Sequence, residues 1–460
     1  MPEIVELEIS DFAENGDGIG RTEGNSEGLA EGLVVFVPNG VPGDRLQVKI
    51  IHQKSNLAHG EILKVLRPSS DRVRPSCIVA DKCGGCSWQA VSYGRQVRLK
   101  HNQVSQALER LGGFEPELIQ DTMVLIQAAE QGFGYRNKVS YPLQAGREQV
   151  KAGYYQRRSH RLINLNQCPV QDQHFDRFLA EIKQDLQRWS IYEEKTHRGA
   201  LRHLCLRRGR RTGQVLLTLV TRYWDLVGIE EQAQTWLGYY SNLVGVVLNL
   251  NPSRTNVILG KESKCIGGQD FVEEIFLGLK FRLRSETFFQ VYTEQAELLV
   301  ERLIRWLNLQ GDELVLDAYG GIGTMTLPLA QRVKRVVAIE SQPEAVAQAQ
   351  LNAELNGITN VECLTGKVEQ LLPGINQPVD VIVLDPPRKG CEPEVLAELR
   401  RLRPRKLVYV SCNPATLARD LKLLCADQLF QLERWQPFDF FPQTVHVETL
   451  VLLSSQAAIA

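Results

Sequence analysis

The sequence predicts a multidomain protein that ends in an α/β domain built on a doubly wound parallel sheet. Three observations support this: short alternating strands at the N-terminus, a cysteine-containing segment after them, and apolar strands that alternate with helices in the last third. A length of 460 residues with 43% hydrophobic residues is enough for several buried cores. We expect an OB-like β-barrel over 1–68, a central α+β domain over 69–284 and an α/β domain over 285–460.

The first domain is expected to be a small OB-like barrel. Turn signals at Asn39-Gly40 and Pro42-Gly43-Asp44 separate apolar runs, and the glycine-rich stretch 14–32 is expected to be a loop between strands. The predicted strands are Ile4 to Ile9, Leu33 to Val37, Leu46 to Ile51 and Gly60 to Leu66.

The next segment carries a cysteine cluster. Cys77, Cys83 and Cys86 have the spacing Cys-x5-Cys-x2-Cys, and Cys168 stands before a proline far downstream. Four thiolates suit an iron–sulfur cluster or a zinc ion, although zinc ribbons usually pair two Cys-x2-Cys knuckles. A disulfide set is the third alternative, and it is disfavoured because a chain of this size without a signal peptide needs no such stapling. We expect the other structurally unassigned cysteines to be free and reduced: Cys205, Cys265, Cys363, Cys391 and Cys425.

The last domain alternates strands and helices. A polar-faced helix is predicted earlier, over Gln96 to Leu111, and leads into the central domain. From residue 285 onward the pattern is that of a seven-stranded Rossmann-like sheet closed by a final antiparallel pair. The predicted strands include Val336 to Ile339, Val381 to Leu384 and Leu407 to Val410, and the predicted helices are Glu294 to Asn308, Glu344 to Asn356, Glu392 to Arg401 and Ala415 to Ala426.

A glycine loop after the strand at Leu314 predicts a nucleoside-binding site. Tyr319 to Thr324 is glycine-rich, and Glu340 ends the next strand, where a carboxylate can accept hydrogen bonds from ribose hydroxyls. A dinucleotide fingerprint would have a third glycine where Thr326 stands, and no phosphate-binding lysine motif is present. With Asp317 before the loop, S-adenosylmethionine is the better ligand, because it has no pyrophosphate to bind. An ordinary strand-to-helix turn is the alternative.

A cysteine at the end of a strand is the strongest sign of chemistry. Cys412 lies in Ser-Cys-Asn-Pro after one apolar strand, and Asp385 opens Asp-Pro-Pro-Arg-Lys-Gly after another. Ligands bind at the carboxyl ends of strands in such sheets, so both residues are placed for chemistry. A lone cysteine there is otherwise a small buried hydrophobe.

These motifs, with Ser-Glu-Thr-Phe-Phe-Gln-Val at 285–291 and His-Val-Glu-Thr at 446–449, resemble the RNA 5-methyluridine methyltransferase family. The resemblance is to members with an N-terminal TRAM domain and an iron–sulfur cluster, and it covers nearly the whole chain. It implies that Gln290, Tyr319, Glu340 and Asp385 hold S-adenosylmethionine. Tyr292 departs from the asparagine of many relatives and receives no role.

The resemblance also implies a mechanism and a metal centre. A thiolate of Cys412 would add to uracil C6, C5 would take the methyl group, and Glu448 would remove the C5 proton. A [4Fe-4S] cluster would be bound by Cys77, Cys83, Cys86 and Cys168. A radical S-adenosylmethionine enzyme is disfavoured because its three cysteines usually have x3 and x2 spacing.

The substrate is expected to be RNA, although the net charge is only −1. Basic runs at 157–161, 207–211 and 400–406, together with Arg136 and Lys138, would contact phosphates. We favour 23S ribosomal RNA, with transfer RNA as the alternative. A 5-methylcytosine enzyme would carry a cysteine where Arg388 stands, and a non-catalytic RNA-binding or folding factor would not need both Cys412 and Glu448.

The hydropathy of the sequence predicts a soluble protein. No apolar run approaches 18 residues and no export signal is evident, so we expect a cytoplasmic protein without a membrane partner. We also expect it to act as a monomer.

Overall fold

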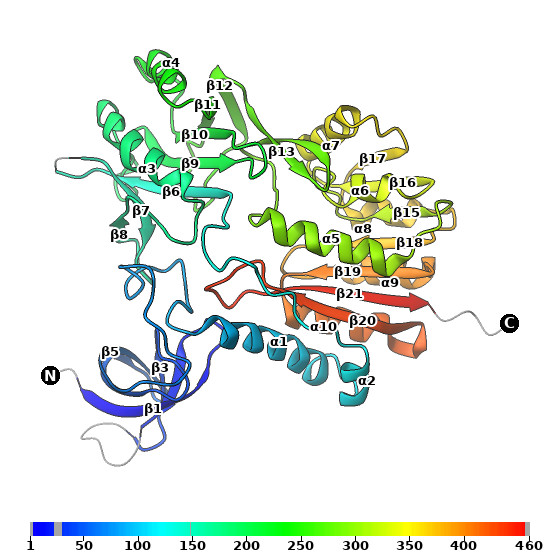
Figure 1. The fold of residues 1–460 in the computed structure, drawn as a ribbon, viewed down its shortest axis with the longest axis horizontal. Coiled ribbons are helices and arrows are strands. Elements are labelled where there is room, and N and C mark those ends of the chain that lie inside the picture. The colour runs from blue at the N-terminus through cyan, green and yellow to red at the C-terminus, as the bar shows by residue number, and fades with distance from the viewer. Residues whose placement is uncertain (1–2, 23–29, 148, 456–460) are drawn as a thin grey trace.

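The computed structural model describes residues 3–22, 30–147 and 149–455. Three β-sheet bodies are arranged around the middle of the molecule: a barrel at the lower left of Figure 1, a mixed sheet at the upper left and a larger α/β unit on the right. Each sheet has its own buried apolar cluster. The predicted fold classes of barrel and terminal α/β domain are therefore observed.

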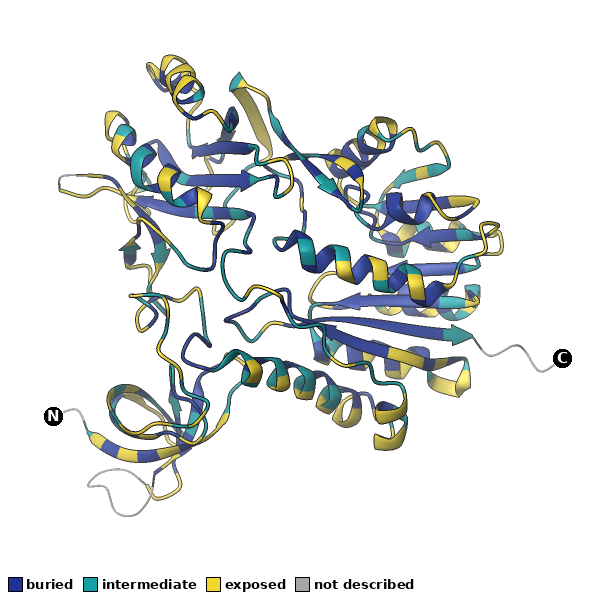
Figure 2. Ribbon diagram, in the orientation of Figure 1, coloured by how far each residue is buried: buried dark blue, intermediate teal, exposed yellow. Residues whose placement is uncertain are grey.

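The barrel is closed in the order β1-β2-β3-β5-β4. Val5, Leu7 and Ile9 are buried and alternate with exposed residues along β1, as the banding of this strand in Figure 2 shows. The barrel strands are β1 (Ile4–Phe12), β2 (Gly18–Arg21), β3 (Val34–Val37), β4 (Arg45–Gln53) and β5 (Leu57–Arg67).

Strand β2 corrects the expectation that 14–32 is a loop. It pairs with both β1 and β3. A Cβ on Gly18 would lie 2.8 Å from the carbonyl oxygen of Gly40, and one on Gly20 would lie 2.5 Å from a methyl of Leu7. The glycines therefore permit close approach of neighbouring backbones in a small barrel, although their composition is typical of a loop. Residues 23–29 of that expectation lie outside the described residues.

The central unit is a seven-stranded sheet of order β12-β11-β10-β9-β6-β7-β8. Strand β10 is buried along its whole length, which explains its continuous apolar run. A hairpin of β13 and β14 then leads toward the α/β unit. The elements are β6 (Lys138–Gln144), β7 (Lys151–Tyr155), β8 (Leu162–Asn164), α3 (His174–Asp185), β9 (Leu201–Arg208), β10 (Val215–Thr221), α4 (Ile229–Tyr239), β11 (Leu243–Leu250), β12 (Glu262–Gly268), β13 (Phe271–Phe276) and β14 (Leu279–Arg284), with a 3-10 turn at Leu186–Arg188.

The α/β unit is a seven-stranded sheet of order β17-β16-β15-β18-β19-β21-β20, parallel except for β21. Two apolar clusters cover its two faces, and the predicted final antiparallel pair is β20 and β21. The elements are α5 (Thr293–Leu307), β15 (Leu314–Asp317), α6 (Thr326–Ala330), β16 (Arg335–Glu340), α7 (Pro343–Leu355), β17 (Val361–Thr365), α8 (Val368–Leu371), β18 (Val381–Leu384), α9 (Pro393–Leu402), β19 (Lys406–Ser411), α10 (Pro414–Leu424), β20 (Phe430–Phe438) and β21 (Glu448–Ser455), with 3-10 turns at Leu372–Gly374 and Ala426–Gln428.

Helix α1 (Tyr93–Arg110) precedes the central sheet in sequence but packs on the α/β unit, beside α10 and β20 (Figure 1). It is followed by the short α2 (Pro116–Asp121). Val104 and Leu108 join the apolar cluster of that unit, while Lys100 is fully buried. The Lys100 ammonium donates to Asp439 Oδ1 at 2.5 Å and to the carbonyl oxygen of Phe441 at 3.0 Å.

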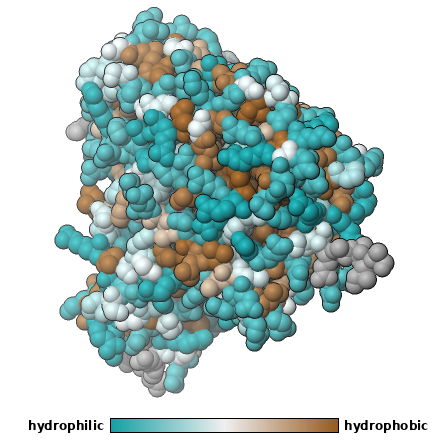
Figure 3. Space-filling view, turned by 45° about the vertical axis from the view of Figure 1, so that its right-hand side comes forward, coloured by the Kyte–Doolittle hydropathy of each residue, from teal (hydrophilic) through white to brown (hydrophobic). Residues whose placement is uncertain are grey.

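Within the described part of the chain, no helix combines the length and apolarity needed to cross a bilayer. On the face seen in Figure 3, hydrophobic side chains form separate groups between larger hydrophilic areas.

The buried ion pair gives a stability prediction. Lys100→Met would leave the Asp439 carboxylate buried without its cation, so we expect a loss of about 3 to 5 kcal/mol in the free energy of unfolding. Urea denaturation followed by circular dichroism measures it.

Lys183→Met is the matched control, because Lys183 is also a buried lysine but its acceptors are neutral: the carbonyl of Leu165 and the side-chain oxygens of Asn164 and Asn166. Its loss should be smaller, at about 1 to 3 kcal/mol. Equal losses in the two variants would contradict a special role for the ion pair.

Candidate active site

The predicted site residues meet at one edge of the α/β sheet. Asp317 ends β15, Glu340 ends β16, and Asp385 directly follows β18. These strands are parallel, so their carboxyl ends share an edge. Cys412 follows β19 at the same edge.

The glycine loop after β15 forms the floor of the site. Gly321 and Gly323 have φ values of 53° and 93°, which side chains other than glycine rarely adopt. The N–H of Gly321 donates to Glu340 Oε2 at 3.2 Å, which holds that carboxylate at the loop. The loop and the carboxylate therefore lie together, as predicted.

One carboxylate oxygen of Asp317, beside this loop, accepts no hydrogen bond. Its Oδ2 accepts from Thr326 Oγ at 2.6 Å, but its buried Oδ1 has no partner. Burial raises the pKa of Asp317 to about 6. An unpaired buried acceptor fits a site that a polar ligand completes.

Tyr319 stands above Cys391, and its hydroxyl donates to the sulfur at 4.0 Å. Cys391 is buried, and its N–H donates to Asp420. The Cys391 thiol is therefore packed in the interior.

Cys412 and Glu448 are brought together by strand pairing. Ser411, the last residue of β19, pairs with Thr449 of the antiparallel β21. Cys412, which follows Ser411, therefore lies beside Glu448, which precedes Thr449. Burial, and after it the charge of the nearby Glu448 carboxyl, raises the pKa of the Cys412 thiol to about 11. The free thiol is therefore protonated at neutral pH.

Two carboxyl groups, those of the buried Glu448 and the half-buried Asp385, share this corner. Burial raises the pKa of Asp385 to about 7, with a contribution from Asp317. Burial, followed by the charge of Asp385, raises the pKa of Glu448 well above its usual value. Such a carboxyl is a stronger base once ionised than an exposed one.

Arg388 is a site residue that the sequence did not assign. Its guanidinium lowers the pKa of both Cys412 and Glu448, against the larger effect of burial. Its carbonyl accepts from Asn413 and Thr416, so the two motif loops are tied together. In the sequence, the place of Arg388 directly after Pro387 in the Asp-Pro-Pro motif could have indicated this role.

Gln290 comes from outside the sheet, in the segment between β14 and α5. Three side chains of the central sheet hold the carbonyls of this segment: Asn137 donates to Gln290 O at 2.9 Å, Lys138 to Ser285 O at 2.8 Å and Arg207 to Thr287 O at 2.6 Å. The central sheet therefore fixes the path of the chain at Gln290. Tyr292, to which the sequence assigned no role, stacks on Tyr135 with the two ring centroids 4.8 Å apart, so its ring packs within the protein.

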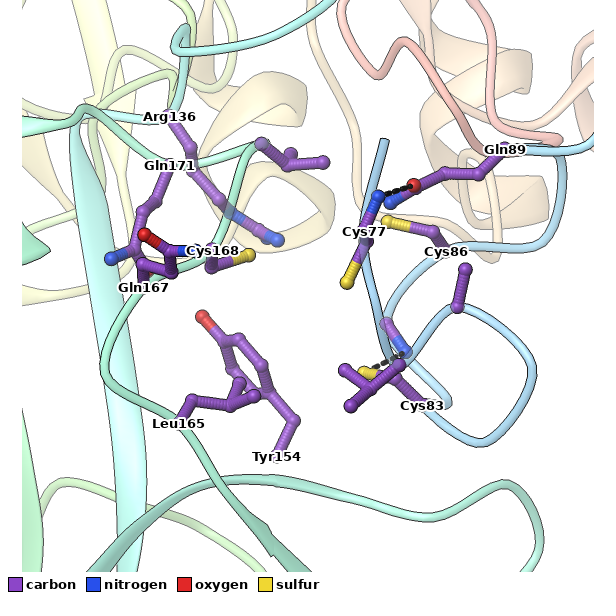
Figure 4. Close-up of a pocket in the computed structure, with 14 residues that line it drawn as sticks. Cys77, Cys83, Cys86, Gln89, Arg136, Tyr154, Leu165, Gln167, Cys168 and Gln171 are labelled. Atoms are coloured by element: carbon purple, nitrogen blue, oxygen red, sulfur yellow. Dashed lines mark hydrogen bonds between the residues drawn. The ribbon is translucent and has the colours of Figure 1, made fainter. Parts of the chain in front are cut away.

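The four clustered cysteines line a single cavity between the segment 77–86 and Cys168 (Figure 4). All ten cysteines of the chain are free, which excludes the disulfide alternative. Among the described residues, no three Cys, His, Asp or Glu side chains are arranged to hold a single metal ion. In Figure 4 the sulfurs of Cys77 and Cys168 are directed into the space between the two segments.

Several side chains of the basic runs expected to contact RNA also form ion pairs and hydrogen bonds within the protein. Arg157 donates to the carbonyls of Cys83 and Cys86, and Arg208 and Arg210 both pair with the buried Asp172. The other pairs are Arg158 with Asp17, Arg211 with Glu297, Arg400 with Asp427, Arg401 with Glu398 and Arg405 with Glu313. Clustering of arginines in sequence therefore reflects internal ion pairs as well as surface charge.

Comparison with known proteins agrees with this geometry. The sequence profile of the family described as tRNA (Uracil-5-)-methyltransferase matches residues 255–456, and that of the TRAM domain matches 3–63. A relative from Nostoc sp., named as an RNA methyltransferase, is 53% identical and covers 98% of this chain and 96% of its own. One from Synechocystis sp. with the same description is 50% identical over the same shares.

The chain belongs to the RNA uracil-5-methyltransferase family, in the branch with a TRAM domain. It is an RNA methyltransferase that uses S-adenosylmethionine. The structure is also similar to that of the Pyrococcus abyssi tRNA (uracil-54, C5)-methyltransferase in complex with S-adenosyl-L-homocysteine, with a TM-score of 0.78, 25% identity and coverage of 98% of this chain and 99% of that one.

The raised pKa of Cys412 gives a testable pH dependence. Below about pH 11 the thiolate fraction of Cys412 rises tenfold per pH unit, whereas that of a free thiol levels off above a pKa of about 8.5. Alkylation of Cys412 by iodoacetamide, without RNA, should therefore still rise log-linearly between pH 8.5 and 10.

The measurement is mass spectrometry of the peptide containing Cys412, with glutathione as the free-thiol reference and Cys412→Ala to confirm the peptide. A rate that levels off together with that of glutathione would show an unperturbed thiol.

Proposed function

We propose that this enzyme forms 5-methyluridine in RNA, with Cys412 as nucleophile and Glu448 as base. The observation that supports it best is the pairing of Ser411 with Thr449, since it sets a thiol and a buried carboxyl side by side. Uracil C5 is too weakly nucleophilic to be methylated directly, so a neighbouring nucleophile is required. The domain division at 68/69 and 284/285 is part of the same proposal.

The reaction runs through a covalent adduct on the RNA. The Cys412 thiol loses its proton to water and the thiolate adds to C6, so that the electron pair of the C5–C6 double bond makes C5 nucleophilic. C5 then bonds to the methyl group while the bond between that methyl group and the donor sulfur breaks, and its electrons stay on the sulfur. After transfer, the Glu448 carboxylate takes the C5 proton. The C–H electrons re-form the double bond, the C6–S bond breaks, and the thiolate of Cys412 leaves.

One side chain assists the first of these steps. Arg388 stabilises the thiolate of Cys412 by its charge, which opposes the effect of burial on the thiol pKa. The target base must leave its stack to reach Cys412, at a cost of a few kcal/mol.

The donor would be held by the floor of the site. S-adenosylmethionine supplies an electrophilic methyl group on a sulfonium. In the proposed assignment Glu340 binds the ribose hydroxyls, while Gln290, Tyr319 and Asp385 contact the rest of the donor. The unpaired Oδ1 of Asp317 supports a polar ligand at this place.

The proposed target is 23S ribosomal RNA, on the strength of the resemblance to enzymes with both a TRAM domain and a cysteine cluster. Transfer RNA is the second candidate. It is favoured by the similarity over the whole chain to a solved tRNA (uracil-54, C5)-methyltransferase.

The cysteine cavity is proposed to hold a [4Fe-4S] cluster on Cys77, Cys83, Cys86 and Cys168. The donors fit, because four thiols from two distant segments line one cavity and no disulfide competes for them. A cluster with four protein ligands would be structural and would join the segment 77–86 to the central domain.

Methyl transfer tests the activity and its target together. With labelled S-adenosylmethionine and unmodified 23S ribosomal RNA or transfer RNA, the wild type should form 5-methyluridine in the ribosomal RNA. Cys412→Ala should lower the rate at least about 10⁴-fold, because it removes the nucleophile.

Glu448→Gln should still transfer the methyl group but release little product, leaving a labelled protein–RNA adduct that survives SDS. Label in transfer RNA alone would favour the second target. Protein that binds the donor and both RNAs but labels neither would refute the assignment.

Iron content tests the metal centre. Anaerobically purified wild type should contain about four iron ions per chain with a broad absorbance near 400 nm, as [4Fe-4S] proteins do. Cys83→Ala should lose most of both. Cys205→Ala is the control, because Cys205 is equally buried but lies on β9 outside the cavity. Zinc in place of iron would overturn the cluster.

A further inference from the structure

Gln443 is a buried residue in a backbone conformation that glutamine rarely adopts. It lies in the segment 439–447, which joins β20 to Glu448, the first residue of β21. Its φ is 71°, in the left-handed region, and only 4% of it is exposed. Residues persist in this region when their surroundings hold them there, and such residues are concentrated at functional sites.

The contacts of Gln443 join three distant segments. Its carbonyl accepts from the N–H groups of Ser87 at 3.1 Å and Trp88 at 3.0 Å. Its own N–H donates to Gln96 Oε1 at 2.9 Å, and its side-chain oxygen accepts from Gln96 Nε2 at 3.1 Å. Its side-chain nitrogen donates to the carbonyl of Gly132 at 3.3 Å. Every polar group of Gln443 therefore has a partner outside the α/β sheet.

The main partner is itself immobilised. Gln96 on α1 is fully buried, and its Nε2 also donates to the carbonyls of Trp88 at 3.0 Å and Val91 at 2.9 Å. Ser87 and Trp88 directly follow Cys86. Gln443 is thus anchored to the segment that leaves the cysteine cavity.

Neighbouring carbonyls of the same segment are held from outside in the same way. Phe441 O accepts from Lys100 at 3.0 Å, and Pro442 O accepts from the Tyr135 hydroxyl at 3.1 Å. Three consecutive carbonyls before Glu448 therefore point to α1, the cysteine segment and the central segment. On the other side, strand pairing of Thr449 with Ser411 fixes the chain.

We propose that Gln443 is a positioning residue for the removal of the C5 proton: it sets the place of the Glu448 carboxylate by tying the segment 439–447 to Gln96 and to the residues after Cys86. This rests on the proposed function of Glu448. Since a glycine would adopt the same φ without strain, the backbone conformation does not account for the presence of a glutamine at position 443. The amide supplies the links to Gln96 and Gly132.

The test separates methyl transfer from release of the product. Gln443→Gly keeps the backbone conformation and removes the side-chain bonds. In a single turnover with labelled S-adenosylmethionine and the RNA that the wild type methylates, label should enter the SDS-stable protein–RNA adduct at nearly the wild-type rate. Release of 5-methyluridine should slow about 10- to 100-fold, as expected for a base displaced by an ångström or less, so the labelled adduct accumulates.

Gln436→Ala is the matched control. Gln436 is a buried glutamine on β20 whose Nε2 donates to the carbonyl of Leu125, so it also joins the α/β unit to the segment before β6. It does not belong to the segment 439–447, and its variant should release product at the wild-type rate.

Three outcomes decide the proposal. Accumulated labelled adduct in Gln443→Gly, as in Glu448→Gln but to a smaller extent, supports it. Release at the wild-type rate, or a parallel loss of adduct and product as from a loosened fold, overturns it. Absence of labelled adduct in Glu448→Gln itself would overturn the proposed function, and the role of Gln443 with it.

Discussion

A buried cation in helix α1 fixes how the first half of the chain is attached to the catalytic sheet. Lys100 is inaccessible to solvent and pairs with the carboxylate of Asp439, which also accepts from the Tyr93 hydroxyl at 3.0 Å. A buried ammonium without its partner would be strongly unfavourable, so the helix has one stable way to dock. The barrel and the cysteine segment precede α1 directly, and their attachment to the site follows from that docking.

The arginines make a second set of attachments. Arg157 reaches the carbonyls of Cys83 and Cys86 and the side chain of Asn39 at 3.0 Å, so one guanidinium joins the central domain, the cysteine segment and the barrel. Asp172 plays the converse part, because one buried carboxylate accepts from Arg208 and Arg210. Arginines therefore join the domains through Arg157 and stabilise the central domain through Asp172.

The parts of the structure that follow from local pattern could be predicted from the sequence. Val381 to Leu384 is observed as β18 with the predicted bounds, because a short apolar run before Asp-Pro-Pro has few other interpretations. The edge that gathers Asp317, Glu340, Asp385 and Cys412 follows from parallel pairing alone. Strand β2 was missed because glycines that permit close packing look like a loop. The pairing of Lys100 with Asp439 and that of Gln96 with Gln443 could not be predicted, since the members of these pairs lie 339 and 347 positions apart in the sequence.

That separation also sets an order of events during synthesis. Translation at about 5 to 20 residues per second places roughly 20 to 70 s between the appearance of Lys100 and that of Asp439. For most of this interval α10 and β20, against which α1 packs, have not been made, so the apolar positions Val104 and Leu108 of α1 are uncovered. The nascent protein therefore carries an open helix face until its final strands emerge. A chaperone that binds exposed apolar helices would meet this chain in that window, and the enzyme becomes complete only as β20 and β21 close the sheet.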